Sequence, residues 1–403
     1  MSESETMTPR ARMRTAMEMK VPDRVPVMCQ LAIGHYFLHS DLDPMDIWFT
    51  SEGFAEACAQ LRKRYQFDGV LINLPGRLPD YKKHIDRIET KKDIREYRLW
   101  WKNGNYTVIP WDDNPHYFQA DGSRYFPTLD EVNPDDLWYV EPWDLTDITW
   151  PYPWAFEDKP RPFDNFFPEY HLDGLRAVRK KVGDTVSVHV EVFSPFAQFL
   201  ELLNYESALM ALLDNPDKAH ACLARLTQGA LALADSYGKE DVDAILISSA
   251  FAGGGMISCD MYEEFVLPYE RRLIKETQAK HNIPFYTHTC GAIGDRLDLM
   301  METGTNGIDT LDPPPLGTVE LEEAVKVLKG KVFIKGNLDP VNTLLRGDEK
   351  TVADAVRHRL RVAAPGGGYI LSSACSVAPA VKPELLEYMT ALVRKEGVYP
   401  IQL

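Results

Sequence analysis

One histidine and two cysteines occupy positions from which they could bind a single metal ion. His288 and Cys290 follow the apolar run 285–287, and Cys375 lies shortly after a second apolar run, 369–371. Residues two apart in an extended chain point the same way, so His288 and Cys290 can aim at one point. Cys375 completes the set if the two strand ends meet. One imidazole and two thiolates favour zinc over magnesium or calcium, which prefer oxygen ligands.

Three protein ligands with a fourth position open are typical of a catalytic zinc rather than a structural one. Such a zinc could bind a substrate thiol as its thiolate, or an ether or phenolate oxygen that must leave. Both roles suit methyl transfer, whereas zinc has no redox chemistry of its own. The alternative is that His288 and Cys290 are ordinary buried residues near the end of a core strand, because short motifs also occur by chance.

The elements that would position these side chains alternate regularly along the chain. Eight apolar runs, nearly all separated by helical patterns, predict a single α/β domain over residues 1–403 with the (β/α)8 TIM-barrel fold. The expected strands are 25–30, 69–74, 186–192, 243–248, 284–287, 307–311, 332–335 and 368–371. An open doubly wound sheet is the alternative arrangement.

An aromatic-rich insertion interrupts this alternation between the second and third expected strands. Residues 98–109 predict a β-hairpin with Asn103-Gly104 as a two-residue turn. Seven of the eight tryptophans lie in residues 98–168, together with many prolines and aspartates. We therefore interpret 98–168 as an inserted hairpin and long loop that could serve as a lid. The alternative is that its aromatic side chains pack on the outside of the core.

Polar residues and glycines gather where the expected strands end, which is where barrel enzymes build their active sites. The candidate catalytic residues are Glu191, Asp312 and Asn337, and the candidate cofactor-binding residues are Gly253, Gly254 and Gly336. Asp312 could be a fourth zinc ligand, could hold His288 in one tautomer, or could cap a turn. The glycines could instead form a flexible loop, and Gly336-Asn337 only a tight turn, with Asp339 capping the helix that follows.

Composition and charge limit the classes of protein to consider. With 403 residues, 45% of them hydrophobic and 26% charged, the chain can bury a large globular core. Its formal net charge of -16 argues against a nucleic-acid-binding protein, which would carry a basic patch. Six scattered cysteines fit a reducing compartment. With neither a signal peptide nor a membrane-spanning run expected, we interpret the protein as cytoplasmic.

Three stretches resemble the uroporphyrinogen decarboxylase superfamily: Arg24-Val25-Pro26-Val27, Met256-Ile257-Ser258 and Gly336-Asn337-Leu338-Asp339-Pro340. The likeness covers most of the chain, is strongest over 241–397, and departs from the family around 98–168. The resemblance implies a TIM barrel, in agreement with the strand count. Decarboxylases of this superfamily carry Arg-Gln-Ala-Gly-Arg after the first strand. Here the matching stretch, 29–35, has no arginine to hold a substrate with many carboxylates.

The other branch of the superfamily, the zinc-dependent corrinoid methyltransferases, has a His-x-Cys and a distant Cys that match His288, Cys290 and Cys375. The resemblance implies zinc at these residues and methyl transfer between a small substrate, of methyl ether or thiol type, and a corrinoid (cobalamin) carried by a partner protein. It also suggests a homodimer. The aromatic insertion favours O-demethylation of an aromatic methyl ether. The competing hypotheses are a metal-free decarboxylase and a non-catalytic corrinoid-binding barrel.

Overall fold

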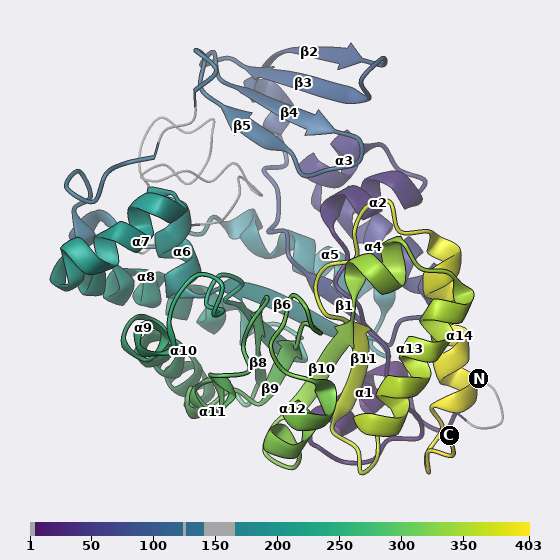
Figure 1. The fold of residues 1–403 in the computed structure, drawn as a ribbon. Helices are drawn as coiled ribbons and strands as arrows, with labels where there is room; N and C mark the ends of the chain where they lie inside the picture. Colours follow the sequence, from purple (N-terminus) through teal and green to yellow (C-terminus); the bar gives the residue numbers. More distant parts are fainter. Residues whose placement is uncertain (1–4, 124–125, 141–165) are drawn as a thin grey trace.

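The computed structural model describes residues 5–123, 126–140 and 166–403. Seven parallel strands form one curved sheet in the order β1-β6-β7-β8-β9-β10-β11 (Figure 1). They are β1 (Gly69–Ile72), β6 (Ser187–Phe193), β7 (Ala244–Ser248), β8 (Phe285–Thr289), β9 (Gly307–Thr310), β10 (Phe333–Leu338) and β11 (Tyr369–Ser373). Every residue of these strands is buried, as expected for parallel strands that face helices on one side and a filled barrel on the other.

Residues 25–31 occupy an eighth position in the sheet and close it into a barrel, although they make only isolated β-bridges. Leu371 exchanges backbone hydrogen bonds with Pro26 and Met28, at 2.9 and 3.0 Å. On the other side of the segment, the Asp68 N–H donates to the Val27 carbonyl at 2.8 Å. The segment therefore lies between β11 and β1, and the predicted (β/α)8 barrel is confirmed.

Helices cover the outside of the barrel (Figure 1). They are α2 (Ile33–His39), α3 (Pro44–Phe49), α4 (Ser51–Tyr65), α5 (Asp173–Val182), α6 (Pro195–Leu203), α7 (Tyr205–Asp214), α8 (Pro216–Tyr237), α9 (Cys259–Phe265), α10 (Leu267–Gln278), α11 (Leu297–Glu302), α12 (Leu321–Leu328), α13 (Glu349–Val362) and α14 (Pro383–Glu396), with short turns η1 (Tyr81–His84), η2 (Pro134–Asp136), η5 (Glu169–Leu172) and η6 (Pro340–Leu345). Asp339 caps η6 as predicted, because its Oδ1 accepts from the Val341 and Asn342 N–H groups at 2.8 and 2.7 Å. Among the described residues, no helix is long and apolar enough to cross a membrane.

The amino-terminal helix α1 (Pro9–Met17) closes the end of the barrel at which the strands begin. Met13 and Met17 join a buried cluster with Tyr286 and other inward-facing strand residues. Arg12, fully buried, donates from Nη1 to Asp68 Oδ1 at 2.6 Å, so a buried ion pair lies at this end. Because this end is filled, the carboxyl ends of the strands are left to form the mouth of the barrel.

The insertion between β1 and β6 contains a four-stranded antiparallel sheet, drawn above the barrel in Figure 1. Its strands are β2 (Ile85–Lys91), β3 (Glu96–Trp101), β4 (Tyr106–Pro110) and β5 (His116–Phe118). The sheet starts at Ile85, earlier than the predicted boundary at residue 98, because the polar exposed strand β2 resembles a loop in sequence. The hairpin turn is also longer than predicted, because the Trp101 N–H donates to the Asn105 carbonyl and leaves three residues in the turn. Gly104, at φ +91°, occupies the left-handed position of this turn.

Part of the predicted insertion, residues 124–125 and 141–165, lies outside the described residues. The described part of the new sheet packs one face inward, with Leu99, Trp101 and Ile109 fully or almost fully buried. Trp101 on this face therefore contributes to the core. That residues 98–168 form a lid stays a prediction.

A carboxyl group without a salt bridge lies inside the helical layer and makes stability depend on pH. Glu270, on α10, is fully buried, and neither of its carboxyl oxygens has a hydrogen bond of good geometry in the described part of the chain. Burial raises the pKa of Glu270 to about 7, although the hydroxyls of Ser249 and Tyr262 partly oppose the shift. The folded state therefore holds this proton more tightly than the unfolded state does.

We expect the free energy of unfolding to fall as pH rises from about 4.5 to about 7, by about 3 kcal/mol from Glu270 alone. Glu270→Gln should remove this contribution and make the protein more stable than the wild type at pH 8. Urea denaturation at pH 5 and pH 8 measures both effects. Glu263→Gln, on the exposed face of α9, is the matched control and should keep the wild-type pH dependence. An unchanged pH dependence in Glu270→Gln would contradict the prediction.

Candidate metal centre

The three predicted metal ligands meet at the mouth of the barrel. His288 is the penultimate residue of β8 and Cys290 follows that strand, whereas Cys375 lies two residues beyond β11. These strands are separated in the sheet by β9 and β10, and the closure of the barrel brings their ends together. His288 Nε2 and the two Sγ atoms all lie within 4.8 Å of one another. The structure thus brings together the three residues that the sequence singled out.

The distances between these atoms fit a tetrahedral zinc ion. Cys290 Sγ lies 3.4 Å from His288 Nε2 and 3.7 Å from Cys375 Sγ, and Cys375 Sγ lies 4.0 Å from Nε2. Tetrahedral zinc with ordinary bond lengths would separate two sulfur ligands by about 3.8 Å, and sulfur from nitrogen by about 3.6 Å. The residues present therefore fit zinc in both chemical type and spacing. Three ligands leave a fourth position for a substrate atom.

Asp309, on the strand next to β8, supports the imidazole of His288. The two residues are in register across β8 and β9, and His288 Nδ1 donates to Asp309 Oδ2 at 3.1 Å. This hydrogen bond leaves Nε2 free to face the two sulfurs. Burial alone would raise the pKa of Asp309, but Lys335 and His288 lower it below its usual value, so the carboxylate is charged. The sequence had offered Asp312 as a partner for His288; Asp309 fills that position.

Asp312 lies beside the metal site in a different role. Its Oδ2 accepts a hydrogen bond from the Gly291 N–H at 2.6 Å, which fixes the turn directly after Cys290. Its Oδ1 is buried and has no hydrogen-bond partner among the described residues. Burial raises the pKa of Asp312 to about 6, and the charge of Cys375 acts in the same direction. Asp312 therefore has one oxygen available for a ligand or a substrate.

Glu191 is a second carboxyl group close to the metal site. It lies near the end of β6 and is almost fully buried. Burial raises its pKa to about 7, while the Ser248 hydroxyl partly lowers it. Asp309 and Cys375 also influence the carboxyl, so Glu191 is near enough to the predicted ligands to respond to their charges. A carboxyl of this kind can gain or lose a proton near neutral pH.

Asn337 is held by structural hydrogen bonds at both ends of its amide. Its Nδ2 donates to the Leu311 carbonyl at 2.7 Å, and its Oδ1 accepts from Arg359 Nε at 3.1 Å. Arg359 also donates to the Asn337 carbonyl at 3.0 Å. These contacts fasten the ends of β9 and β10 to α13. These contacts give Asn337 a structural role. A catalytic role for Asn337 stays a prediction.

The candidate cofactor-binding glycines allow close approaches between backbone segments. A Cβ atom at Gly253 would lie 2.4 Å from the Cys290 carbonyl oxygen, and one at Gly336 would lie 2.4 Å from the Thr310 carbonyl oxygen. The Gly254 N–H donates to the Ala292 carbonyl at 2.6 Å. Gly253 and Gly254 thus hold the loop after β7 against the segment that follows β8. Direct contact of these glycines with a cofactor stays a prediction.

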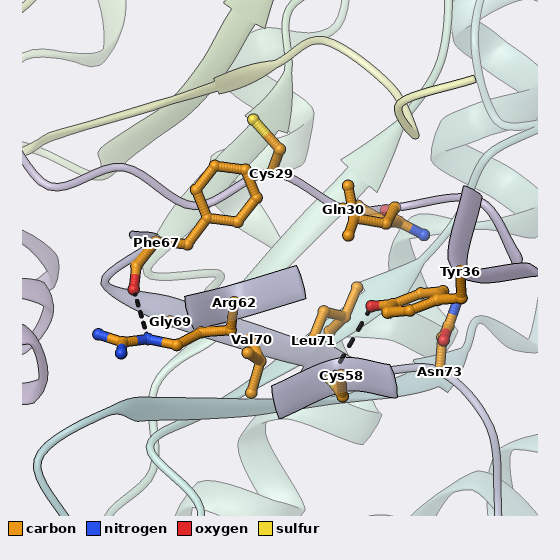
Figure 2. Close-up of a pocket in the computed structure, with 11 residues that line it drawn as sticks. Cys29, Gln30, Tyr36, Cys58, Arg62, Phe67, Gly69, Val70, Leu71 and Asn73 are labelled. Carbon is orange, nitrogen blue, oxygen red and sulfur yellow. Dashed lines mark hydrogen bonds between the residues drawn. The ribbon is translucent and has the colours of Figure 1, made fainter. Parts of the chain in front are cut away.

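A narrow pocket lies where the first strand segment and β1 meet α2 and α4. Figure 2 shows its lining, with the Tyr36 hydroxyl 3.9 Å from the Cys58 thiol. Arg62 is the one arginine that lines this pocket, and its Nε donates to the Phe67 carbonyl at 2.9 Å. The pocket borders the stretch 29–35, where the decarboxylase pattern would carry arginines. Arg62, which comes from α4, is the cation that the described pocket lining offers beside that stretch.

Sequence reasoning missed Lys335, which contacts Asp309 behind the metal site. It ends the apolar run 332–335 and was interpreted only as the last residue of an expected strand. In the structure it is 2% exposed, and its Nζ lies 3.0 and 3.2 Å from the two Asp309 carboxylate oxygens. The alternation of side chains along a strand could have identified Lys335. Residues two apart point to the same face, and Phe333 points into the barrel, so Lys335 does too.

Comparison with known proteins places this chain in a family. The family model described as "Uroporphyrinogen decarboxylase (URO-D)" matches residues 156–396. The chain belongs to the uroporphyrinogen decarboxylase family. A methyltransferase from Methanosarcina mazei has the same fold, with a TM-score of 0.66 at 18% sequence identity, covering 96% of this chain and 99% of that one.

Curated relatives carry two different activities in their names. Uroporphyrinogen decarboxylase from Myxococcus xanthus is 27% identical over 236 residues, which are 56% of this chain and 63% of the relative. Methylcobamide:CoM methyltransferase MtaA from Methanosarcina barkeri is 26% identical over 228 residues, which are 57% of this chain and 63% of the relative. The match thus spans less than two thirds of the length of each relative. The family is therefore shown, and the reaction has to be argued from the site.

Proposed function

We propose that this protein is a zinc-dependent methyltransferase that moves a methyl group between a small substrate and a corrinoid cofactor carried by a partner protein. The observation that carries the proposal is the group of His288 Nε2, Cys290 Sγ and Cys375 Sγ, with spacings close to those of tetrahedral zinc. The similarity to methylcobamide:CoM methyltransferases supports the same reaction class.

The donor set favours a substrate atom that zinc can bind at the fourth position. When bound, the zinc would act as a Lewis acid that keeps a substrate thiol ionised or helps an ether oxygen to leave. His288 would be held in the required tautomer by Asp309. A substrate of methyl ether or thiol type therefore suits the site, and the aromatic insertion favours an aromatic methyl ether as donor.

Glu191 and Asp312 are the groups of this chain that could move a proton at the site. If a thiol is methylated, it loses its proton before the methyl group arrives, and Glu191 in its carboxylate form can take that proton. If an ether is demethylated, its oxygen needs a proton as the methyl group leaves, and protonated Glu191 can supply it. Either direction uses a carboxyl with a pKa near 7, which burial gives Glu191. Asp312 can orient the substrate through its unpaired Oδ1.

The second candidate function is decarboxylation of a porphyrinogen, because relatives of that name match equally well. A substrate with many carboxylates needs several cations to hold it. In the described part of the barrel mouth, Arg359 is bound to Asn337, and Lys335 is bound to Asp309. The stretch 29–35 supplies no arginine. These observations favour methyl transfer over decarboxylation.

A spectroscopic assay tests the proposal. The protein, purified with zinc, is mixed with cob(I)alamin and a panel of methyl ethers and methyl thioethers, or with methylcobalamin and a panel of thiols. We expect about one zinc per chain and, for at least one substrate, an absorbance change that reports methyl transfer. Zinc-stripped protein is the control and should be inactive until zinc is restored. Turnover of a porphyrinogen without zinc would contradict the proposal, as would tight cobalamin binding without transfer from any donor.

A further inference from the structure

A buried ammonium group is linked to the metal site through one carboxylate. Lys335 lies in register with Asp309 across β9 and β10, just as Asp309 lies in register with His288 across β8 and β9. Side chains in register on neighbouring strands point the same way, so these three stand in one row inside the barrel. The hydrogen bonds of the row run from Lys335 Nζ to Asp309 and from His288 Nδ1 to Asp309.

Lys335 also reaches the strand that carries the third ligand. Its Nζ lies 3.2 Å from Ser372 Oγ, three residues before Cys375 on β11. An ammonium group has three N–H donors, and here the two Asp309 oxygens and Ser372 provide three acceptors. The orientation of Lys335 is therefore fixed on both sides of β10. It connects the support of His288 to the strand that positions Cys375.

Lys335 provides the positive charge that pairs with Asp309 beside the proposed zinc site. Two thiolates match the double charge of one zinc ion, so the buried Asp309 adds a negative charge that needs a partner. Lys335 supplies it, and both side chains of the pair are 2% exposed. An isolated charge in such a place would be costly. A hydrophobic residue would fill the same volume without burying a charge, so filling space does not explain a lysine here.

We propose that Lys335 is a positioning residue of the metal centre, which acts through Asp309 to fix the His288 ring and which balances the charge of that carboxylate. This inference rests on the metal site of the proposed function, but not on the reaction. It assigns a role to a residue that touches neither the ligand atoms nor a substrate.

Lys335→Met tests the proposal through metal binding rather than through activity. We expect its zinc affinity, measured by competition with a chromophoric chelator, to fall by about 10-fold or more, in the range found when the partner of a ligating histidine is changed. The absorption spectrum of the cobalt(II)-substituted protein should change as well, because the imidazole is no longer held in one orientation. An unchanged zinc affinity together with an unchanged cobalt spectrum would overturn the proposal.

A double-mutant cycle asks whether Lys335 acts through Asp309. Asp309→Asn and the double variant Lys335→Met/Asp309→Asn should bind zinc with similar affinities, because removing Lys335 has little further effect once the carboxylate charge is gone. A double variant that binds zinc much more weakly than Asp309→Asn would contradict the proposed route. The double variant removes both charges of the pair, so this comparison is available even if Lys335→Met alone does not fold.

Arg12→Met provides the matched control. It also removes a buried cation from a buried carboxylate, Asp68, which keeps Arg24 as a second partner, but at the opposite end of the barrel. It should lower stability and leave zinc affinity and the cobalt spectrum unchanged. If Arg12→Met changes the zinc affinity and the cobalt spectrum as strongly as Lys335→Met does, the effect is general destabilisation and the proposal fails. Wild-type protein that binds zinc without moving a methyl group would disprove the proposed function and leave this inference standing.

Discussion

Cys375→Ser is expected to leave the chain with little or no zinc and with methyl transfer lowered by more than about 100-fold, because losing a ligand should cost more than losing a partner of a ligand. A serine hydroxyl stays protonated at neutral pH and is a poor zinc ligand, so only His288 and Cys290 would remain. The Sγ atoms of Cys290 and Cys375 lie 3.7 Å apart, which is why removing one of them breaks the site. Zinc per chain after dialysis against a weak chelator measures the effect.

Cys259→Ser is the matched control for this experiment. Cys259 is only partly buried, at the start of α9, where its thiol lies 3.4 Å from the Asp295 carbonyl oxygen. It is not part of the group that could hold a metal. The control variant should therefore keep both zinc and activity. The metal centre would be wrong if Cys375→Ser and Cys259→Ser held zinc equally well.

Most of the barrel could be predicted because its strands are buried on both faces. Runs such as Ile245-Leu246-Ile247 are continuous and apolar, and helical patterns with polar faces separate them. The first strand was also placed correctly, although residues 25–31 make only isolated bridges in the structure. The start of the inserted sheet was missed, because β2 has only two apolar residues, Ile85 and Ile88, and every residue of the strand is exposed or partly exposed.

The three candidate metal ligands could be singled out from the sequence, whereas the residues that contact them could not. Cysteine and histidine are rare enough for His288, Cys290 and Cys375 to stand out from the chain. Lys335 and Asp309 are common residue types, and what gives them a role is the register between β9 and β10. Register between strands that are distant in sequence depends on how the sheet closes, and no local pattern encodes it. For the same reason Asp312 and Asp309 could not be told apart before the structure.

Glu191→Gln is expected to lower kcat/KM at pH 7 by about 100-fold, the lower end of what a positioned acid or base contributes. The amide keeps the size of the side chain but cannot exchange a proton. Because burial raises the pKa of Glu191 to about 7, the wild-type pH profile should bend near pH 7, and the bend should be missing in the variant. Initial rates from pH 5.5 to pH 8.5 with the best substrate of the spectroscopic assay measure both effects.

The direction of the bend distinguishes the two reactions that the site could support. Methylation of a thiol needs the carboxylate form of Glu191, so the rate should rise as pH increases through 7; demethylation of an ether needs the protonated form, so the rate should fall. Glu270→Gln is the control, because burial raises its pKa to the same value on a helix that holds none of the predicted ligands. Glu270→Gln should change the free energy of unfolding and keep the bend near pH 7 in the plot of rate against pH. A bend that persists in Glu191→Gln and disappears in Glu270→Gln would assign the proton to the wrong carboxyl and remove Glu191 from the mechanism.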